Sequence, residues 1–186
     1  LGFAAPIAAY GLTNLLIQRL DVVLLGLFVG RAPGLTLVSF GVFCAAVEVA
    51  GGLRKVRQAF DPLLAPIVAG GRARHDTATI MTALARVGRW VLATQLPLIG
   101  VLALSGGLVL SIFGPGFRAG AQVLLLLGLA HGTNAFAGLA ETVLMVERPV
   151  LNLVNSIVTL VLQCGLSLIL IPRLGATGAA LAMLAG

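Results

Sequence analysis

Long apolar stretches without charge alternate with short polar or Gly/Pro-rich turns along the chain. Residues 90–117 and 149–172 contain no charged side chain, and residues 119–140 contain only His131 as a titratable group. A helix that crosses a membrane needs about 20 mostly apolar residues, whereas a barrel strand needs about 10 of alternating polarity. None of these stretches alternates with a period of two, so the pattern predicts membrane-spanning helices.

Turn signals divide the chain into six predicted helices. Gly and Pro residues mark turns near residues 31–34, 70–72, 114–116, 147–149 and 172–175. Asp76 is a predicted N-cap, and Pro149 stands at a favourable first helical position. The predicted helices cover residues 3–29, 35–68, 76–112, 118–146, 149–171 and 176–186. The last one is expected to be truncated, and because the chain begins with Leu1 we expect a fragment of a longer protein.

Composition supports a membrane protein and excludes two other classes. Hydrophobic residues make up 59% of the chain and charged residues 10%, against about 25% charged in a typical soluble domain. Too little polar surface is available to cover a soluble domain, and a disordered chain would need low hydrophobicity. The net charge of +6 is explained by the basic loops of membrane proteins, so we expect no nucleic-acid partner.

Basic residues are distributed unevenly about the predicted membrane. Eight lie toward one side, where the second and third predicted helices meet and where the fourth ends: Arg54, Lys55, Arg57, Arg72, Arg74, Arg86, Arg89 and Arg148. Three lie toward the other side: Arg31, Arg118 and Arg173. The excess of positive charge predicts that the first side is cytoplasmic. The second and third predicted helices are about 52 Å long at 1.5 Å per residue, so both are expected to project beyond a ~30 Å hydrocarbon core.

Several short motifs resemble those of one transporter family. Residues 18–26 (QRLDVVLLG) resemble the start of a repeat in polysaccharide-unit flippases, and residues 65–67 (API) resemble a helix end, with Ile67 where that family usually has a basic residue. Residues 113–117 (FGPGF), 147–152 (ERPVLN) and 171–180 (IPRLGATGAA) also fit. Their order resembles the C-terminal six-helix half of lipid-linked oligosaccharide flippases, in the multidrug, oligosaccharidyl-lipid and polysaccharide export superfamily.

The resemblance implies both an architecture and a function. It implies an all-α integral membrane protein in which this six-helix bundle is one half of a two-bundle, alternating-access transporter. It further implies that the cargo is a lipid-linked oligosaccharide or polysaccharide repeat unit, flipped across the bacterial cytoplasmic (inner) membrane. The implied partners are the lipid-linked saccharide, membrane lipids and the N-terminal half of the same protein, with no cofactor.

Charged and polar residues inside the first predicted helix are the first candidates for a binding site. A charge at the membrane centre costs about 3 kcal/mol or more, so Arg19 and Asp21 each need a partner or a water-filled cavity. At about 100° per residue the two side chains point apart, and Asp21 shares its face with Asn14 and Gln18. Two interpretations of Arg19 stay open: an ion pair with an acidic residue such as Glu48, or a contact with the phosphate of the cargo. Arg19, Gln18, Asn14 and Asp21 are therefore candidate substrate contacts.

A polar stripe follows the fifth predicted helix. Its members fall within an arc of about 120°: Asn152, Asn155, Ser156, Thr159, Gln163 and Ser167. The stripe fits a cavity wall that binds sugar hydroxyls or pyrophosphate, and it fits equally well hydrogen bonds between helices, worth about 0.6 kcal/mol a pair. Asn152, Asn155 and Gln163 are the candidate substrate contacts here.

Three titratable residues inside predicted spans are candidates for ion coupling. His131 and Glu141 share one helix face, where they indicate either a packing seam or a proton-linked site. Glu48 lies too far along its helix from Lys55 for a direct bond, because seven residues span about 10 Å. Glu48 therefore needs another partner or water.

Motifs for catalysis are missing, so we expect no enzyme, no catalytic residues and no bound metal. The main alternative to a flippase is a cation-coupled multidrug exporter of the same superfamily, which would use Asp21, Glu48 and Glu141. An integral membrane glycosyltransferase or polymerase is least favoured, since it would need large loops with catalytic acids.

Overall fold

The structure is a computed structural model that describes residues 4–32 and 34–185. These residues form helices and connecting turns, in the order α1 (Ala4–Phe28), α2 (Leu37–Gln58), α3 (Asp61–Ala73), α4 (Thr77–Ser111), the 3-10 helix η1 (Pro115–Gly120), α5 (Ala121–Glu147), α6 (Pro149–Leu174) and α7 (Ala176–Ala185). The described part of the chain contains no strand, as the sequence predicts. The predicted ends of the first and last helices, at residues 3 and 186, lie outside the described residues.

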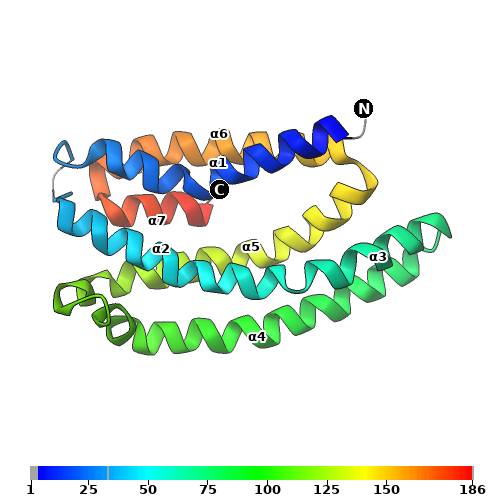
Figure 1. Ribbon diagram of the computed structural model, residues 1–186, viewed down its shortest axis with the longest axis horizontal. Helices are drawn as coiled ribbons and strands as arrows, with labels where there is room; N and C mark the ends of the chain where they lie inside the picture. Colours follow the sequence, from blue (N-terminus) through cyan, green and yellow to red (C-terminus); the bar gives the residue numbers. More distant parts are fainter. Residues whose placement is uncertain (1–3, 33, 186) are drawn as a thin grey trace.

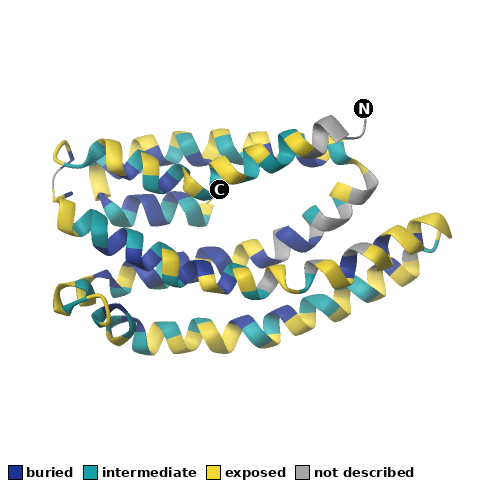
Figure 2. Ribbon diagram, in the orientation of Figure 1, coloured by how far each residue is buried: buried dark blue, intermediate teal, exposed yellow. Residues whose placement is uncertain are grey.

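Four helices are long and apolar enough to cross a membrane among the described residues. They are Ala8–Phe28 in α1, Leu37–Val56 in α2, Ala78–Ser111 in α4 and Pro149–Leu174 in α6. Exposed positions recur along these helices (Figure 2). Many of them carry large apolar side chains; Leu104 on α4, for example, is 92% exposed. Such a surface is stable in lipid and not in water. The chain is therefore an all-α, multi-pass membrane protein, and the complete six-span bundle stays a prediction.

The second predicted helix, 35–68, is wrong as a single helix, because the structure divides it into α2 and α3. α2 ends at Gln58, Ala59 and Phe60 form a turn, and Pro62 stands in the first turn of α3. Proline has no N–H to donate to the carbonyl of Gln58 four residues earlier, and its ring clashes with that carbonyl. α3 nevertheless continues roughly along the direction of α2, and with α4 it makes a hairpin that projects from the bundle (Figure 1).

The loop of this hairpin differs in one respect from the prediction. Gly70 and Gly71 do not end the helix, which continues to Ala73; the turn comes at His75, whose φ of 54° is left-handed. The predicted N-cap is confirmed, since the Asp76 side chain accepts a hydrogen bond from the Thr79 amide at 3.0 Å. The Thr79 hydroxyl also donates to this carboxylate, and together with that amide it lowers the pKa of Asp76.

Two further helix ends differ from the predicted ones. η1 occupies residues 115–120, so α5 begins at Ala121 and not at residue 118. α6 passes through Pro172 and ends at Leu174, before Gly175 with a φ of 58°. Pro172 lacks only its own N–H, and the Gly175 amide still donates to the Ile171 carbonyl at 2.8 Å, so the last turn survives.

The helices form two groups that meet along α5 and α7. α1 packs on α6, and α6 packs on α7; α5 packs on both α2 and α4 and joins the groups through α7 (Figure 1). The turns α1–α2, α4–α5 and α6–α7 lie together at one end of the bundle, which we call the core end. The α3–α4 hairpin and the α5–α6 turn at Arg148 lie toward the other end, which we call the hairpin end (Figure 1).

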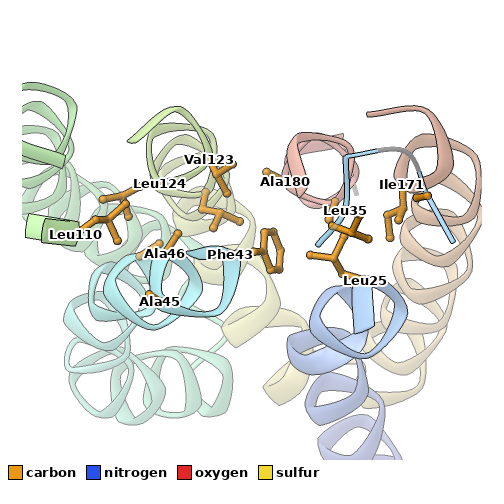
Figure 3. Packing of buried hydrophobic residues seen from close by; sticks show 14 residues of the cluster. Leu25, Leu35, Phe43, Ala45, Ala46, Leu110, Val123, Leu124, Ile171 and Ala180 are labelled. Atoms are coloured by element: carbon orange, nitrogen blue, oxygen red, sulfur yellow. The ribbon is translucent and has the colours of Figure 1, made fainter. Parts of the chain in front are cut away.

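The largest apolar core lies at the core end. Leu25, Phe43, Leu124 and Ile171 are fully buried there, from four different helices (Figure 3). Small residues such as Ala180 fill the remaining space between them. A second apolar cluster (Leu64, Val68, Ile80 and Leu139) holds the α3–α4 hairpin against α5. The helices are thus tightly packed at the core end.

Gly178 allows α7 to approach α6 closely at the core end. A Cβ atom at this position would lie 2.3 Å from the Leu170 carbonyl oxygen and 2.6 Å from its carbonyl carbon. Both atoms belong to backbone, so they cannot move aside without moving the helix. The close approach brings the adjacent Ala179 and Ala180 into the core.

Candidate functional site

A cavity of about 580 Å³ lies between the helices toward the hairpin end, and we call it the polar cavity. It is bounded by the N-terminal half of α1, the C-terminal ends of α2 and α7, the C-terminal half of α5 and the N-terminal half of α6. Its volume lies within the ~300–1,000 Å³ typical of small-molecule sites. The apolar core fills the space between the same helices at the core end, so we infer that the cavity is closed toward that end.

The α1 wall of the cavity is a hydrogen-bonded ladder. Tyr10, Asn14 and Gln18 are spaced by four residues and all line the cavity. The Asn14 amide donates to the Tyr10 hydroxyl at 3.1 Å, and the Gln18 amide donates to Asn14 Oδ1. The predicted contacts Asn14 and Gln18 therefore stand on one cavity wall. Each amide retains further hydrogen-bonding capacity for a ligand.

The other walls come from α5 and α6. His131 and Glu141, predicted to share a face, both line the cavity from α5, together with Asn134. α6 contributes Thr159 and Gln163. His131 is 6% exposed and Gln163 is 3% exposed, so both belong to the inner surface of the bundle. The cavity thus brings together amides, hydroxyls and a titratable ring from separate helices.

The other members of the α6 stripe do not all reach the cavity. Ser156 lines it, although its hydroxyl donates to the Asn152 carbonyl within the helix at 3.0 Å. Asn152 and Ser167 are buried on the same helix at 1% and 0% exposure and do not line the polar cavity. Asn155 is exposed and lies outside the cavity. Of the three candidate contacts on this helix, the structure places Gln163 in the cavity wall and Asn152 and Asn155 away from it.

Arg54 is a cavity residue that the sequence pattern did not single out as a candidate for binding. It lies on α2, lines the polar cavity and also lines a smaller neighbouring cavity. It lies within the predicted helix 35–68 and was counted with the basic residues of the predicted cytoplasmic side; in the structure this part of the chain is the end of α2. Val47, seven residues earlier, shares a helix face with Arg54 and lines the smaller cavity with it. Arg54 supplies the guanidinium of the polar cavity.

The smaller cavity, about 100 Å³, lies beside α1 and α2, and we call it the side pocket. Arg19, Asp21 and Glu48 line it. Arg19 Nη1 lies 3.3 Å from Glu48 Oε1, so of the two interpretations left open for Arg19 the structure contains the ion pair with Glu48. The two side chains are 68% and 66% exposed, so the pair lies at the surface of the bundle. Arg19 does not line the polar cavity.

Asp21 lies on α1 three residues after Gln18, at the end of the hydrogen-bonded ladder, and is 2% exposed. The predicted divergence of Arg19 and Asp21 is confirmed, since one is exposed and the other buried. Among the residues that the structure describes, no three His, Cys, Asp or Glu side chains are arranged to hold a metal ion.

Comparisons with known proteins add no relative to this description. Neither a family model, nor a curated protein, nor a solved structure matches the chain.

Proposed function

We propose that the chain is one half of an alternating-access transporter for an amphiphile with an anionic, sugar-bearing head group. The cargo is a lipid-linked oligosaccharide or polysaccharide repeat unit, and the membrane is the bacterial cytoplasmic membrane. The observation that carries this proposal is a polar cavity at the basic, hairpin end of a bundle whose other end is closed by an apolar core. A conformation of this kind suits the loading of cargo from the cytoplasm.

The chemistry of the cavity wall fits such a head group. The Arg54 guanidinium can bind a phosphate through two parallel hydrogen bonds. The amides of Asn14, Gln18 and Gln163 and the Thr159 hydroxyl offer both donors and acceptors, which sugar hydroxyls require. Arg19 offers a second cation at the side pocket, if cargo displaces Glu48. The acyl or polyprenyl tail stays in lipid, since the outer faces of the helices are apolar.

The second bundle of the transporter is expected outside residues 1–186. The resemblance to flippases implies two six-helix bundles that rock against each other around a central site. The exposed Arg19–Glu48 pair supports this arrangement, because charged groups within a span face water or protein and not lipid. We therefore propose that the face containing this pair borders the central, water-filled space.

A cation-coupled multidrug exporter is the second candidate. Two acidic groups favour it: Glu141 lines the polar cavity, and the carboxylate of Asp21 is buried at the end of the α1 ladder. An organic cation would need such carboxylates and would gain nothing from Arg54. The basic and amide character of the wall makes the anionic cargo our first choice.

Transport by the full-length protein in proteoliposomes tests the proposal. A labelled lipid-linked saccharide and a fluorescent organic cation are assayed side by side, with empty liposomes as the blank. We expect translocation of the saccharide and not of the cation. The reverse result would support the exporter, and transport of neither would contradict both.

Two matched pairs of variants assign the effect to the cavity. Arg54→Gln is expected to weaken cargo binding roughly tenfold to a hundredfold, because a hydrogen bond to a charged group is worth about 1.5–3 kcal/mol. Arg118→Gln is the control, because Arg118 is exposed on η1 and lines neither cavity. Gln163→Leu is expected to weaken it roughly fivefold for the loss of about 1 kcal/mol. Asn155→Leu on the exposed face of the same helix should leave transport unchanged. Equal effects of Gln163→Leu and Asn155→Leu would contradict the assignment.

A further inference from the structure

A cluster of one aromatic and two basic side chains lies on α4, away from both cavities. Trp90 is 61% exposed, and Arg86 and Arg89 are exposed beside it. None of the three lines the polar cavity or the side pocket. The transport function proposed above makes no use of them.

The position of this cluster along α4 places it at the boundary of the membrane. α4 contains 35 residues and ends at Ser111. About 20 residues at 1.5 Å each cross a ~30 Å hydrocarbon core, so counting back from Ser111 reaches the opposite boundary near residue 91. Trp90 then stands at the boundary, and Arg86 and Arg89 stand among the lipid head groups. Tryptophan is enriched at this depth, where one side of the ring meets hydrocarbon and the N–H meets water.

The two guanidinium groups have no acidic partner among the residues that the structure describes. Arg89 donates its Nε–H to the Ala85 carbonyl at 3.2 Å, which uses one of its five N–H groups. Asp76, the acidic residue at the start of α4, is occupied by Thr79. Because Arg86 and Arg89 are three residues apart, their side chains are neighbours on the helix surface. The cluster is therefore a concentrated positive charge at head-group depth.

We propose that Arg86, Arg89 and Trp90 form a binding site for the head group of anionic glycerophospholipids. The planar guanidinium groups match a phosphate diester in shape and charge, and the Trp90 ring packs beside the first carbons of the acyl chains. The depth of the site selects a lipid over a soluble phosphate, since only a lipid presents its phosphate at this level. The site would hold the base of the α3–α4 hairpin against the anionic cytoplasmic leaflet.

Fluorescence of Trp90 measures this binding directly, because Trp90 is the one tryptophan of the 186-residue chain. The full chain is placed in bilayers that contain a fixed mole fraction of brominated phosphatidylglycerol or of brominated phosphatidylcholine, in an unbrominated phosphatidylcholine background. Bromine on the acyl chains quenches tryptophan on contact. We expect stronger quenching by the anionic lipid.

Substitutions assign the preference to the two arginines. Arg86→Gln should lower the association constant of the anionic lipid relative to phosphatidylcholine roughly fivefold, and adding Arg89→Gln should remove the preference. Arg118→Gln is the matched control, since Arg118 is an exposed arginine at the other end of the bundle, on η1. Lys at both positions should preserve part of the preference, because charge is retained while the fork geometry is lost.

Three outcomes would overturn the proposal. Equal quenching by the two lipids in the unsubstituted chain is one, and an unchanged preference in the double Gln variant is another. If that variant does not fold, the salt dependence of the unsubstituted chain decides. The preference should fall as ionic strength rises, because salt screens exposed charges over about 10 Å at 0.1 M; a preference that does not change with salt is the third.

Discussion

The contact between α6 and α7 gives the sharpest test of the fold. We predict that Gly178→Ala destabilises the protein. The added Cβ would lie 2.3 Å from the Leu170 carbonyl oxygen and 3.1 Å from the Ile171 amide nitrogen. Ordinary contact between nonbonded atoms requires about 3.5–4.0 Å, so α7 must move away by roughly 1 Å or more. That movement would withdraw Ala179 and Ala180 from the core.

The size of the effect follows from two opposing terms. Overpacking of this kind costs about 1–3 kcal/mol, whereas alanine in place of a helical glycine contributes about 0.5–1 kcal/mol of stability. We therefore expect a net loss of about 1–2 kcal/mol in the free energy of unfolding. Gly165→Ala is the matched control, because Gly165 is an exposed residue of α6 and nothing lies within 4 Å of a Cβ added at this position. This control should be at least as stable as the unsubstituted protein.

Reversible unfolding in mixed micelles, with increasing sodium dodecyl sulfate and helix content as the signal, measures both variants. The prediction concerns the difference between them, which removes errors common to the method. If Gly178→Ala unfolds at the same detergent fraction as Gly165→Ala, the close approach of α6 and α7 is not present in the protein in solution.

Two further predictions concern charged groups outside the polar cavity. The Arg19 and Glu48 side chains are 68% and 66% exposed. We therefore expect Arg19→Gln, Glu48→Gln and the double variant each to change the free energy of unfolding by no more than about 1 kcal/mol. If one single variant lost much more stability and the second substitution restored it, the ion pair would have to be shielded from water. The hydrogen bonds from the Thr79 hydroxyl and amide lower the pKa of Asp76, so its cap stabilises the start of α4 above the ordinary carboxyl range and is lost as the pH falls through the lowered pKa. Hydrogen exchange of the backbone amides of residues 77–80, corrected for intrinsic rates, should therefore accelerate in acid. The Asp76→Asn variant should not show this acceleration. The same acceleration in the variant would contradict the assignment of the pH dependence to the Asp76 cap.

The helical, membrane-spanning character could be predicted because it depends on local sequence. The uncharged stretches 90–117 and 149–172 exceed the length of a span, and α4 and α6 occupy most of both. The Asp76 cap is local too, since donor and acceptor are three residues apart. The break before α3 was also within reach, because proline is favoured in the first turn of a helix, where Pro62 stands. It was missed because the stretch was judged by its apolar length.

The cavity could be predicted only in part, because it depends on how separate helices approach one another. Periodicity correctly put Asn14 and Gln18 on one face of α1, and His131 with Glu141 on one face of α5. It could not say that these faces meet Gln163. A helical projection also put Asn155 and Gln163 in one arc, yet an arc of about 120° is wide enough for one edge to face outward. Arg54 was missed because it was treated only as part of the basic charge on one side of the membrane.

The composition of the two ends bears on how a transporter of this kind would move. Under the proposed mechanism, release of cargo outside requires the core end to open, and the cost depends on the apolar area that water then reaches, at about 25 cal/mol per Å². Several of the buried residues there, such as Ala46, Ala50 and Ala179, are small. An alanine exposes little area when helices separate, whereas Phe43 and Leu124 expose much more. The few large side chains therefore set most of the cost of opening, and the alanines set how closely the helices pack when the end is closed. A bundle closed in this way can be tight and still open at moderate cost, which a core of uniformly large residues would not permit.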